Sequence, residues 1–426
     1  MRARDLSANT RDNLIWPDAA EYDRAMLDWS HTIHDPEVRS GALFRDATGP
    51  IHLGGGIVCA YRVSDWVIRC LTRHPPPDLA QRYQAITEHL AAYADEHPQD
   101  ADWIVPCAFV DPGIYLGGQD WPIVKVALVK DGAPLGAFMN EHRHDHEVMR
   151  ALAERWAALM AHLRTARVAH GDLDLTNVLV CGAASDMRLR LIDYDGMYVP
   201  TLAGRALMEN GHEHFQPLDA AARHFDADMD NFSALVIYLS IAALAEDPTL
   251  WDTCQADEGA RLLLGADDFA NMGLSLHVAA LNRKGTPAVW SCMDALAASI
   301  EAGAMPPALD VVLATPPRER TTPVTTRQAD TFSPPIPTGQ TLALFPSATA
   351  RVSSELVSAT PAPGPAVVGG LVNWSLPDGQ PGSSVTLVTT RLARRRRVVF
   401  AALWTLTILV TIASIVAAVM SVARTL

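Results

Sequence analysis

The sequence HGDLDLTNVLVCGAASDMRLRLIDYD occupies residues 170–195. Its apolar run VLV predicts a short strand, and the alternating pattern MRLRLI predicts a second one. The turn residues GAASD separate the two patterns, which favours a β-hairpin. Asp172, Asn177 and Asp193 stand at the ends of these strands. The hairpin is therefore expected to bring two carboxylates and one amide close together.

Phosphoryl transfer from ATP requires this set of side chains. In that reaction one Asp orients the attacking hydroxyl, while an Asn and a second Asp hold magnesium ions on the phosphates. Asp172 and Asn177 are therefore the predicted catalytic residues, and Asn177 and Asp193 are the predicted metal ligands. The predicted cofactors are ATP and Mg²⁺.

The motif at 170–177 resembles the catalytic loop of protein kinases, in which H-R-D-L is followed by three residues and an Asn. The three residues Asp193-Tyr194-Asp195 stand where kinases have Asp-Phe-Gly. More narrowly, the chain resembles bacterial protein-kinase-like proteins that carry HGDLxxxNVLV, LIDYDGMYVP and DNFSALVIYL. The resemblance covers roughly residues 30–265.

This resemblance implies an α+β fold with two lobes, as in protein kinases. A small β-rich N-terminal lobe is expected over 41–130, after an N-terminal extension over 1–40. A mainly helical C-terminal lobe is expected over 131–303.

The resemblance places the nucleotide between the lobes. A Gly-rich turn lets backbone amides approach phosphates closely, and the sequence LGGGIV at 53–58 has this composition. A helix predicted over 79–93 contains Glu88, and an apolar strand predicted over 121–129 contains Val126. The residues expected to bind the nucleotide and its metal are Gly54, Gly56, Val58, Arg69, Glu88, Val126 and Asp193.

Arg69 departs from the kinase pattern, which has a Lys on the third strand. The chain contains three Lys residues, and none precedes Lys125. Lys125 is expected to point away from the pocket, because alternate residues of a strand face opposite sides. Arg69 is therefore expected to neutralise the phosphates and to form an ion pair with Glu88. On this basis we expect the exchange Arg69→Lys to preserve or raise activity.

Other departures concern the loops. Gly171 replaces the Arg of H-R-D, and Asp174 replaces a Lys. Asp195 replaces a glycine and is expected only to turn the chain, while the ring of Tyr194 is expected to pack under the helix that carries Glu88. Downstream, the sequence from Asp230 resembles the start of a buried kinase helix, and Asp230 is expected to brace the catalytic loop and to cap the helix.

Three functions remain open. The chain is expected to be a membrane-anchored protein kinase-like phosphotransferase that acts on Ser/Thr hydroxyls. The alternative is a nucleotide-binding pseudokinase that serves as a scaffold for a protein partner. A small-molecule phosphotransferase is the third reading. Retention of Asp172, Asn177 and Asp193 does little to separate the enzyme from the pseudokinase. The tether and the helix that begins at Asp230 disfavour the small-molecule phosphotransferase.

Charge is divided unevenly along the chain. The 426 residues carry a net charge of −14, and residues 1–300 hold 24 basic and 42 acidic side chains. A nucleic-acid-binding domain needs a basic face, so nucleic acid is excluded as a partner. Six cysteines are scattered without C-x-x-C spacing, which makes a zinc site or a disulfide framework a poor interpretation.

The C-terminal part has a different composition. Residues 304–390 are rich in Pro, Thr, Ser and Ala, which predicts a disordered linker. A basic cluster at 391–397 precedes an uncharged apolar run, and 398–421 is long enough for one transmembrane helix. Positive charge marks the cytoplasmic side of a span. We therefore expect a single-pass, tail-anchored protein of the cell membrane with its N-terminal domain in the cytoplasm.

Overall fold

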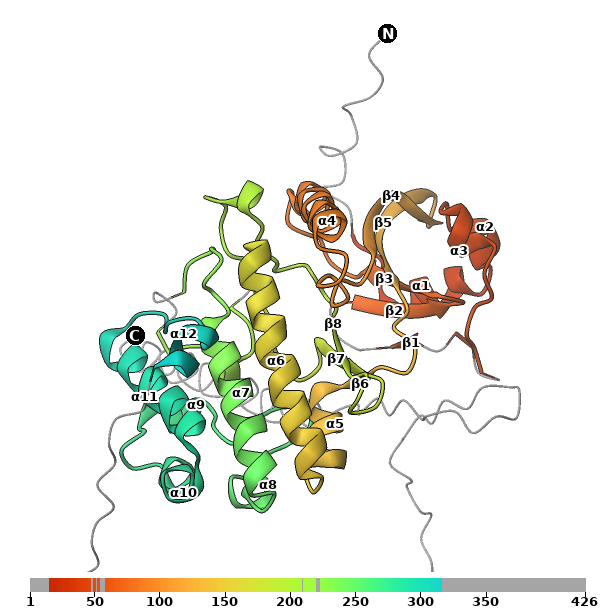
Figure 1. The fold of residues 1–426 in the computed structure, drawn as a ribbon. Helices are drawn as coiled ribbons and strands as arrows, with labels where there is room; N and C mark the ends of the chain where they lie inside the picture. Colours follow the sequence, from red (N-terminus) through yellow and green to blue (C-terminus); the bar gives the residue numbers. More distant parts are fainter. Residues whose placement is uncertain are drawn as a thin grey trace, which may run out of the picture. The chain divides into compact units, whose positions relative to one another are not determined.

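The computed structural model describes residues 15–46, 49–50, 52–53, 58–208, 210–219 and 223–315. These residues form a mixed α+β structure with two antiparallel sheets, which confirms the predicted α+β class (Figure 1). The predicted glycine turn at Gly54 and Gly56 lies outside the described residues, as do the predicted basic cluster and transmembrane helix. Within the described ranges, no helix is both long and apolar enough to cross a membrane.

The larger sheet has five strands in the order β1-β2-β3-β5-β4. Neighbouring strands are antiparallel, and Arg69 on β3 lies opposite Ala60 on β2 and Val124 on β5. The predicted strands around Arg69 and Val126 are therefore confirmed. The strands are β1 (His52–Leu53), β2 (Val58–Val63), β3 (Trp66–Leu71), β4 (Cys107–Leu116) and β5 (Gln119–Ala127).

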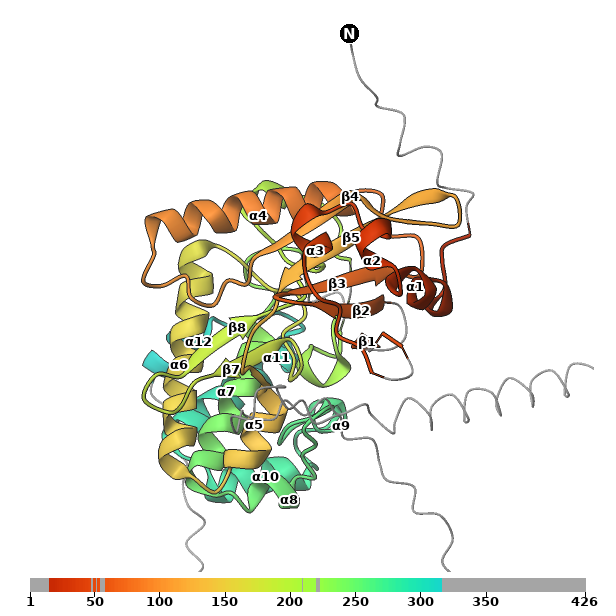
Figure 2. The ribbon, with the colours of Figure 1, turned by 90° about the vertical axis from the view of Figure 1, so that its right-hand side faces the viewer.

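Helices cover both faces of this sheet (Figure 2). Residues alternate between the faces, so Ile68 packs in the cluster formed with α1 to α3, while Leu71 packs in the cluster formed with α4. Residues 15–40, which belong to the predicted N-terminal extension, thus contribute to the core of this sheet. The helices are α1 (Ala19–Met26), α2 (Trp29–Thr32), α3 (Pro36–Arg39) and α4 (Leu79–Glu96).

Lys125 belongs to the face of the sheet that is covered by α1 to α3. Its Nζ lies 2.8 Å from Asp35 Oδ2 and 2.8 Å from Glu37 Oε2, and 4.4 Å from the centre of the Trp66 ring. Arg69 is directed to the other face because it is one position out of phase with Ile68, the residue opposite Lys125. The prediction that Lys125 points away from Arg69 is therefore confirmed.

The second sheet contains the predicted hairpin. In the strand order β6-β7-β8, Val178 pairs with Leu191, and β6 (Ala133–Pro134) pairs with β7. The two hairpin strands are β7 (Val178–Cys181) and β8 (Arg188–Leu191). The pairing places the residues just before β7 and just after β8 at the same end of the hairpin.

Two long helices form the centre of the helical part and lie side by side (Figure 1). The helix α6 (His146–Ala166) is amphipathic, whereas α7 (Asn231–Glu246) is buried on almost every side. Trp156 Nε1 of α6 donates a 3.1 Å hydrogen bond to the carbonyl oxygen of Ala234 on α7. This packing gives the 170–177 loop a fixed support, because α6 precedes that loop directly.

Shorter elements complete the helical part. These are α5 (Leu135–His142), α8 (Leu250–Thr253), α9 (Ala266–Ala270), α10 (Leu276–Lys284), α11 (Pro287–Ala302), α12 (Leu309–Ala314) and the 3₁₀ turns η2 (Pro200–Leu202) and η3 (Glu213–Phe215).

The helix α12 corrects the predicted start of the linker at residue 304. Leu309 and Val312 are buried in the main hydrophobic cluster, and Asp310 forms an ion pair with Arg164 of α6. The proline-rich composition suggested an extended segment, but Pro306 and Pro307 precede the helix, where proline does not break its hydrogen bonds. Part of the predicted linker therefore belongs to the folded domain.

Candidate functional site

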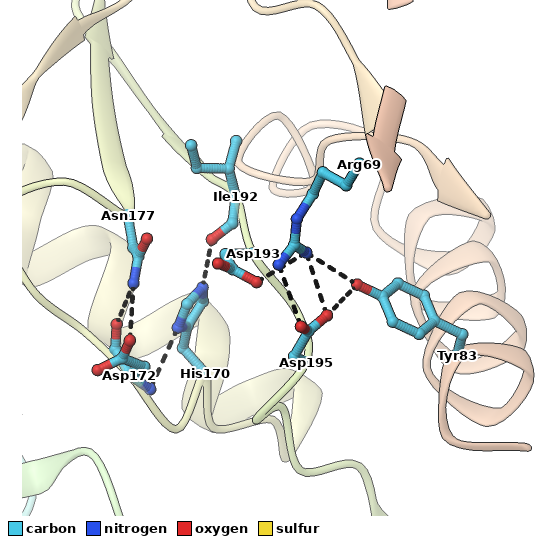
Figure 3. A network of polar contacts seen from close by, with 8 residues as sticks. All are labelled: Arg69, Tyr83, His170, Asp172, Asn177, Ile192, Asp193 and Asp195. Atoms are coloured by element: carbon cyan, nitrogen blue, oxygen red, sulfur yellow. Dashed lines mark hydrogen bonds and ion pairs between the residues drawn. The ribbon is translucent and has the colours of Figure 1, made fainter. Parts of the chain in front are cut away.

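The 170–177 loop brings Asp172 and Asn177 together. Asn177 Nδ2 donates to the backbone oxygen of Asp172 at 2.8 Å and to its Oδ2 at 3.1 Å (Figure 3). Asp174 Oδ1 accepts from the backbone amides of Thr176 at 2.8 Å and Asn177 at 2.9 Å, which holds the turn between them. The carboxylate and the amide therefore have fixed positions relative to each other.

Asp230 supports the start of this loop from below. Its Oδ1 accepts from the Gly171 amide at 2.9 Å, and its Oδ2 accepts from the His170 amide. The residue stands at the N-cap position of α7, yet its side chain makes no capping hydrogen bond. The prediction that Asp230 braces the loop is therefore confirmed, and the prediction that its side chain caps α7 is wrong.

Gly171 has no room for a side chain. Its φ is +85°, and a Cβ atom at this position would lie 2.3 Å from the carbonyl oxygen of Gly196. An Arg between His170 and Asp172 would therefore displace backbone. Arg223 Nη2 approaches the same loop from another segment and donates to the Gly171 carbonyl oxygen. No local pattern predicts this contact, since Arg223 lies 52 residues from Gly171 along the chain.

His170 connects this loop to β8 and the metal-ligand candidate Asp193. The imidazole is fully buried, and its Nε2 donates to the Ile192 carbonyl oxygen at 2.8 Å. Its Nδ1 accepts from the Asp172 amide at 3.3 Å, so the neighbours define the tautomer. Tyr194 packs edge-on against this ring and lies in the same buried cluster as Ile86 of α4.

Asp193, Asp195 and Arg69 form the most highly charged part of the site (Figure 3). Arg69 Nη1 and Nη2 donate to Asp195 Oδ1 and Oδ2, each at 3.1 Å, and Arg69 Nη1 lies 2.9 Å from Asp193 Oδ1. The side chains of Arg69 and Asp195 are 12% and 18% exposed, while that of Asp193 is 40% exposed. The five-stranded sheet and the loop after β8 are therefore joined by one guanidinium group.

Asp195 was expected only to turn the chain, and that prediction is wrong. The left-handed backbone position is at Asp193, whose φ is +69°, and not at Asp195. Asp tolerates this conformation better than most residues. The turn at Asp193 directs the Asp195 carboxylate toward the guanidinium, where it forms a two-point contact.

The predicted ion pair between Arg69 and Glu88 is also wrong. Glu88 is exposed and accepts a 2.8 Å hydrogen bond from Gln84 of the same helix. Tyr83 is the α4 residue that reaches Arg69, because its hydroxyl accepts from Arg69 Nη1 at 3.3 Å and donates to Asp195 Oδ1. Tyr83, Ile86 and Leu90 form the buried face of α4. Their helical spacing was the sequence signal that could have excluded Glu88.

Val126 lies on the same face of the sheet as Arg69. Its side chain is 9% exposed and belongs to the apolar cluster of Tyr83 and Val124, with Ile192 packed against it. The predicted contact of Val126 with a nucleotide stays a prediction. Val58 begins β2, but its side chain is outside the described part of the structure.

Burial shifts the proton affinities of the acidic groups. The pKa of Asp172 is raised to about 6, first by burial and then by the negative charge of Asp174. Burial also raises the pKa of Asp193, although the Arg69 guanidinium lowers it. The pKa of Asp230 is likewise raised by burial, against the effect of nearby His170.

The carboxylate and amide oxygens of the site suit a magnesium ion that is bound together with phosphates. Asp172 Oδ1 is buried and accepts no hydrogen bond within the described residues, whereas the buried Asp193 Oδ1 is paired with Arg69 Nη1 at 2.9 Å. The same part of the chain contains no group of three or more His, Cys, Asp or Glu side chains that could hold a metal ion. Mg²⁺ usually needs only one or two carboxylates when substrate phosphates and water supply its other oxygens. Asn177 and Asp193 thus fit a metal that arrives with a nucleotide.

Comparisons with known proteins add no family assignment. No protein-family model matches the chain, and a search of curated proteins found no significant match.

Proposed function

We propose that the described domain binds ATP with Mg²⁺ and transfers the γ-phosphate to a Ser or Thr hydroxyl of a protein. One observation carries the proposal: Asp172, Asn177 and Asp193 lie in one site at a loop and two strand ends, and Arg69 is paired with Asp193. The five-stranded sheet and the helical part correspond, in this proposal, to the two lobes of a protein kinase.

Each residue has a distinct role in the proposed reaction. Asp172 accepts a hydrogen bond from the attacking hydroxyl and orients its oxygen toward the γ-phosphorus atom. Asn177 holds Asp172 in place and, together with Asp193, would supply oxygen ligands to Mg²⁺, which neutralises charge on the phosphates when bound. Arg69 contributes positive charge from β3, and the predicted glycine turn at Gly54 and Gly56, which lies outside the described residues, would cover the phosphates.

The free carboxylate oxygen of Asp172 supports its role. Asp172 Oδ2 is held by Asn177, while Oδ1 accepts no hydrogen bond in the described residues. A pKa of about 6 leaves Asp172 mostly ionised at neutral pH and able to accept a hydrogen bond.

The proposed location of this activity is the cytoplasmic face of the cell membrane. The apolar run at 398–421 would anchor the chain, and the segment before it would serve as a tether to the domain. Tethering restricts the domain to hydroxyls near the membrane, which favours a protein over a freely diffusing small molecule. If the full-length chain stays in the aqueous fraction after membranes are pelleted, the anchor is refuted.

A pseudokinase scaffold is the second candidate, and one observation favours it. Two carboxylates and the Tyr83 hydroxyl already occupy the guanidinium of Arg69. A cation that is neutralised in this way stabilises phosphates less than an unpaired Lys would. In that case the domain would bind a nucleotide slowly or weakly and act through a protein partner.

The deciding experiment uses full-length protein in detergent micelles with labelled ATP and Mg²⁺. Asp172→Asn is the matched control, because it preserves the size of the side chain and removes its negative charge. Phosphate incorporation into the protein or a generic protein substrate that disappears in the control supports the enzyme. Nucleotide-dependent thermal stabilisation without transfer favours the scaffold. Neither stabilisation nor transfer would refute both nucleotide functions.

A further inference from the structure

Arg69 contacts two carboxylates in different ways, and this difference has a consequence for the metal. Asp195 meets the guanidinium with both oxygens at 3.1 Å and accepts two aligned hydrogen bonds. Asp193 meets it with a single oxygen at 2.9 Å, which is a one-point contact. A two-point contact with a planar guanidinium is the stronger of the two arrangements. Asp195 is therefore the main partner of Arg69.

We propose that Asp195 and Tyr83 are positioning residues that hold Arg69, so that Asp193 remains available to Mg²⁺. The inference rests on the proposed nucleotide function and assigns a role that the sequence did not suggest. Arg69 and a metal ion would compete for the same oxygen, Asp193 Oδ1, because both are cations. Because Asp195 holds the guanidinium at two points, Arg69 competes less strongly for this oxygen and the metal binds it more readily.

Tyr83 extends this control to the position of α4. Its hydroxyl bridges Arg69 and Asp195, so a shift of the helix would disturb both partners. The N-terminal end of α4 is itself tied to the segment that follows the site, because Arg82 donates to the Ala206 carbonyl oxygen at 2.8 Å. A movement of either segment would thus change how Arg69 is shared between the carboxylates.

Removing the charge of Asp195 should have two opposite effects. The guanidinium would lose its two-point partner and keep Asp193 as its remaining carboxylate partner, so more Mg²⁺ would be needed to occupy the site. The same loss would release part of the positive charge of Arg69 toward the phosphates. Nucleotide binding without metal should therefore stay constant or become tighter. A residue with only a structural role would weaken both kinds of binding together.

The experiment measures binding of a fluorescent ATP analogue to full-length protein in detergent, with and without Mg²⁺. For Asp195→Asn we expect the half-saturating Mg²⁺ concentration to rise about tenfold, which equals about 1.4 kcal/mol. Affinity for the metal-free analogue should not fall. Tyr83→Phe should move the Mg²⁺ dependence in the same direction by a smaller factor, and Asp195→Glu should restore much of the wild-type value.

Several results would overturn the proposal. An unchanged Mg²⁺ dependence in Asp195→Asn, or equal losses of affinity with and without metal, would do so. If Asp195→Asn fails to fold, Tyr83→Phe becomes the deciding variant, and its Mg²⁺ dependence must rise. The matched comparison is Asp193→Asn, which should abolish the Mg²⁺ effect on binding.

Failure of the proposed function gives a different result. Wild-type protein would then bind no analogue under any condition, and the role toward the metal would be refuted with it. The contact itself is tested without nucleotide by a double-mutant cycle of Tyr83→Phe and Asp195→Asn in thermal unfolding. Losses that simply add would show that the two side chains are not coupled.

Discussion

The exchange Arg69→Lys tests the central contact of the site. The kinase pattern, which has a Lys on the third strand, predicts that Arg69→Lys preserves or raises phosphotransfer activity. In the structure Arg69 makes a two-point contact with Asp195, an ion pair with Asp193 and a hydrogen bond to Tyr83. A Lys ammonium is a point charge and cannot reproduce the planar fork. We therefore expect Arg69→Lys to lower both stability and nucleotide binding.

The size of the effect follows from the contacts that are lost. A hydrogen bond to a charged group contributes about 1.5–3 kcal/mol, and Lys should lose one such contact with Asp195. Arg69→Ala removes the cation from both carboxylates, for which a buried pair would cost about 3–5 kcal/mol. The 40% exposure of Asp193 reduces that figure, since water can partly solvate its charge. The loss for Ala should nevertheless exceed the loss for Lys.

Thermal unfolding of the full-length protein shows whether Arg69→Ala destabilises it more than Arg69→Lys does. A loss of 1 kcal/mol lowers the melting temperature by roughly 2–4 °C in a domain of this size class. Lys125→Arg is the matched control, because Lys125 lies on the opposite face of the same sheet with its own acidic partners, Asp35 and Glu37. Arg69→Lys should melt several degrees below this control. Equal melting temperatures for wild type, Arg69→Lys and Arg69→Ala would refute the network.

Three further variants test other parts of the structure. Asp172→Asn should raise the melting temperature more near pH 8 than near pH 5. The pKa of Asp172 is about 6 in the folded state and 3.8 in the unfolded state, so the ionised carboxylate destabilises the fold increasingly as the pH rises from 3.8 to 6. Equal gains at the two pH values would contradict this. Asp230→Asn should lower the free energy of unfolding by about 1–3 kcal/mol, because the backbone amide of His170 or of Gly171 loses its acceptor. A denaturant titration that shows no loss would exclude a supporting role of Asp230 for the loop. A chain that ends at residue 303 should have a free energy of unfolding about 3 kcal/mol or more below that of a chain that ends at 315, because the buried side chains of Leu309 and Val312 are removed. Equal denaturation midpoints would show that α12 does not stabilise the fold.

Local patterns predicted most of the elements that carry the site. The hairpin around Asn177 formed as expected, because its two strands have separate apolar patterns and a clear turn between them. The helix over 79–93 and the strand with Val126 followed from periodicity in the same way. The convergence of Asp172 with Asn177 could be predicted because only a short loop separates them.

Contacts between distant segments were harder to predict. Tyr83 and Asp195 lie 112 residues apart, and no local pattern shows which helix residue faces which loop. Glu88 has the charge that a partner of Arg69 needs, but the buried face of α4 is formed by Tyr83, Ile86 and Leu90, and Glu88 lies outside it. The contact between Arg223 and Gly171 could not be predicted either, because it depends on the path of the long segment between them.

Two departures from the kinase pattern, at residues 69 and 195, belong together in the structure. A broad guanidinium at position 69 needs a partner with two oxygens in its own plane, and Asp195 supplies this partner from the loop after β8. With Glu88 in solvent, α4 acts on Arg69 only through the neutral hydroxyl of Tyr83. The carboxylate that fixes the cation therefore belongs to the loop that carries Asp193 and not to the helix. Whether the domain acts as an enzyme or a scaffold should accordingly depend on how readily Mg²⁺ displaces Arg69 from Asp193, which binding measurements with and without metal determine directly.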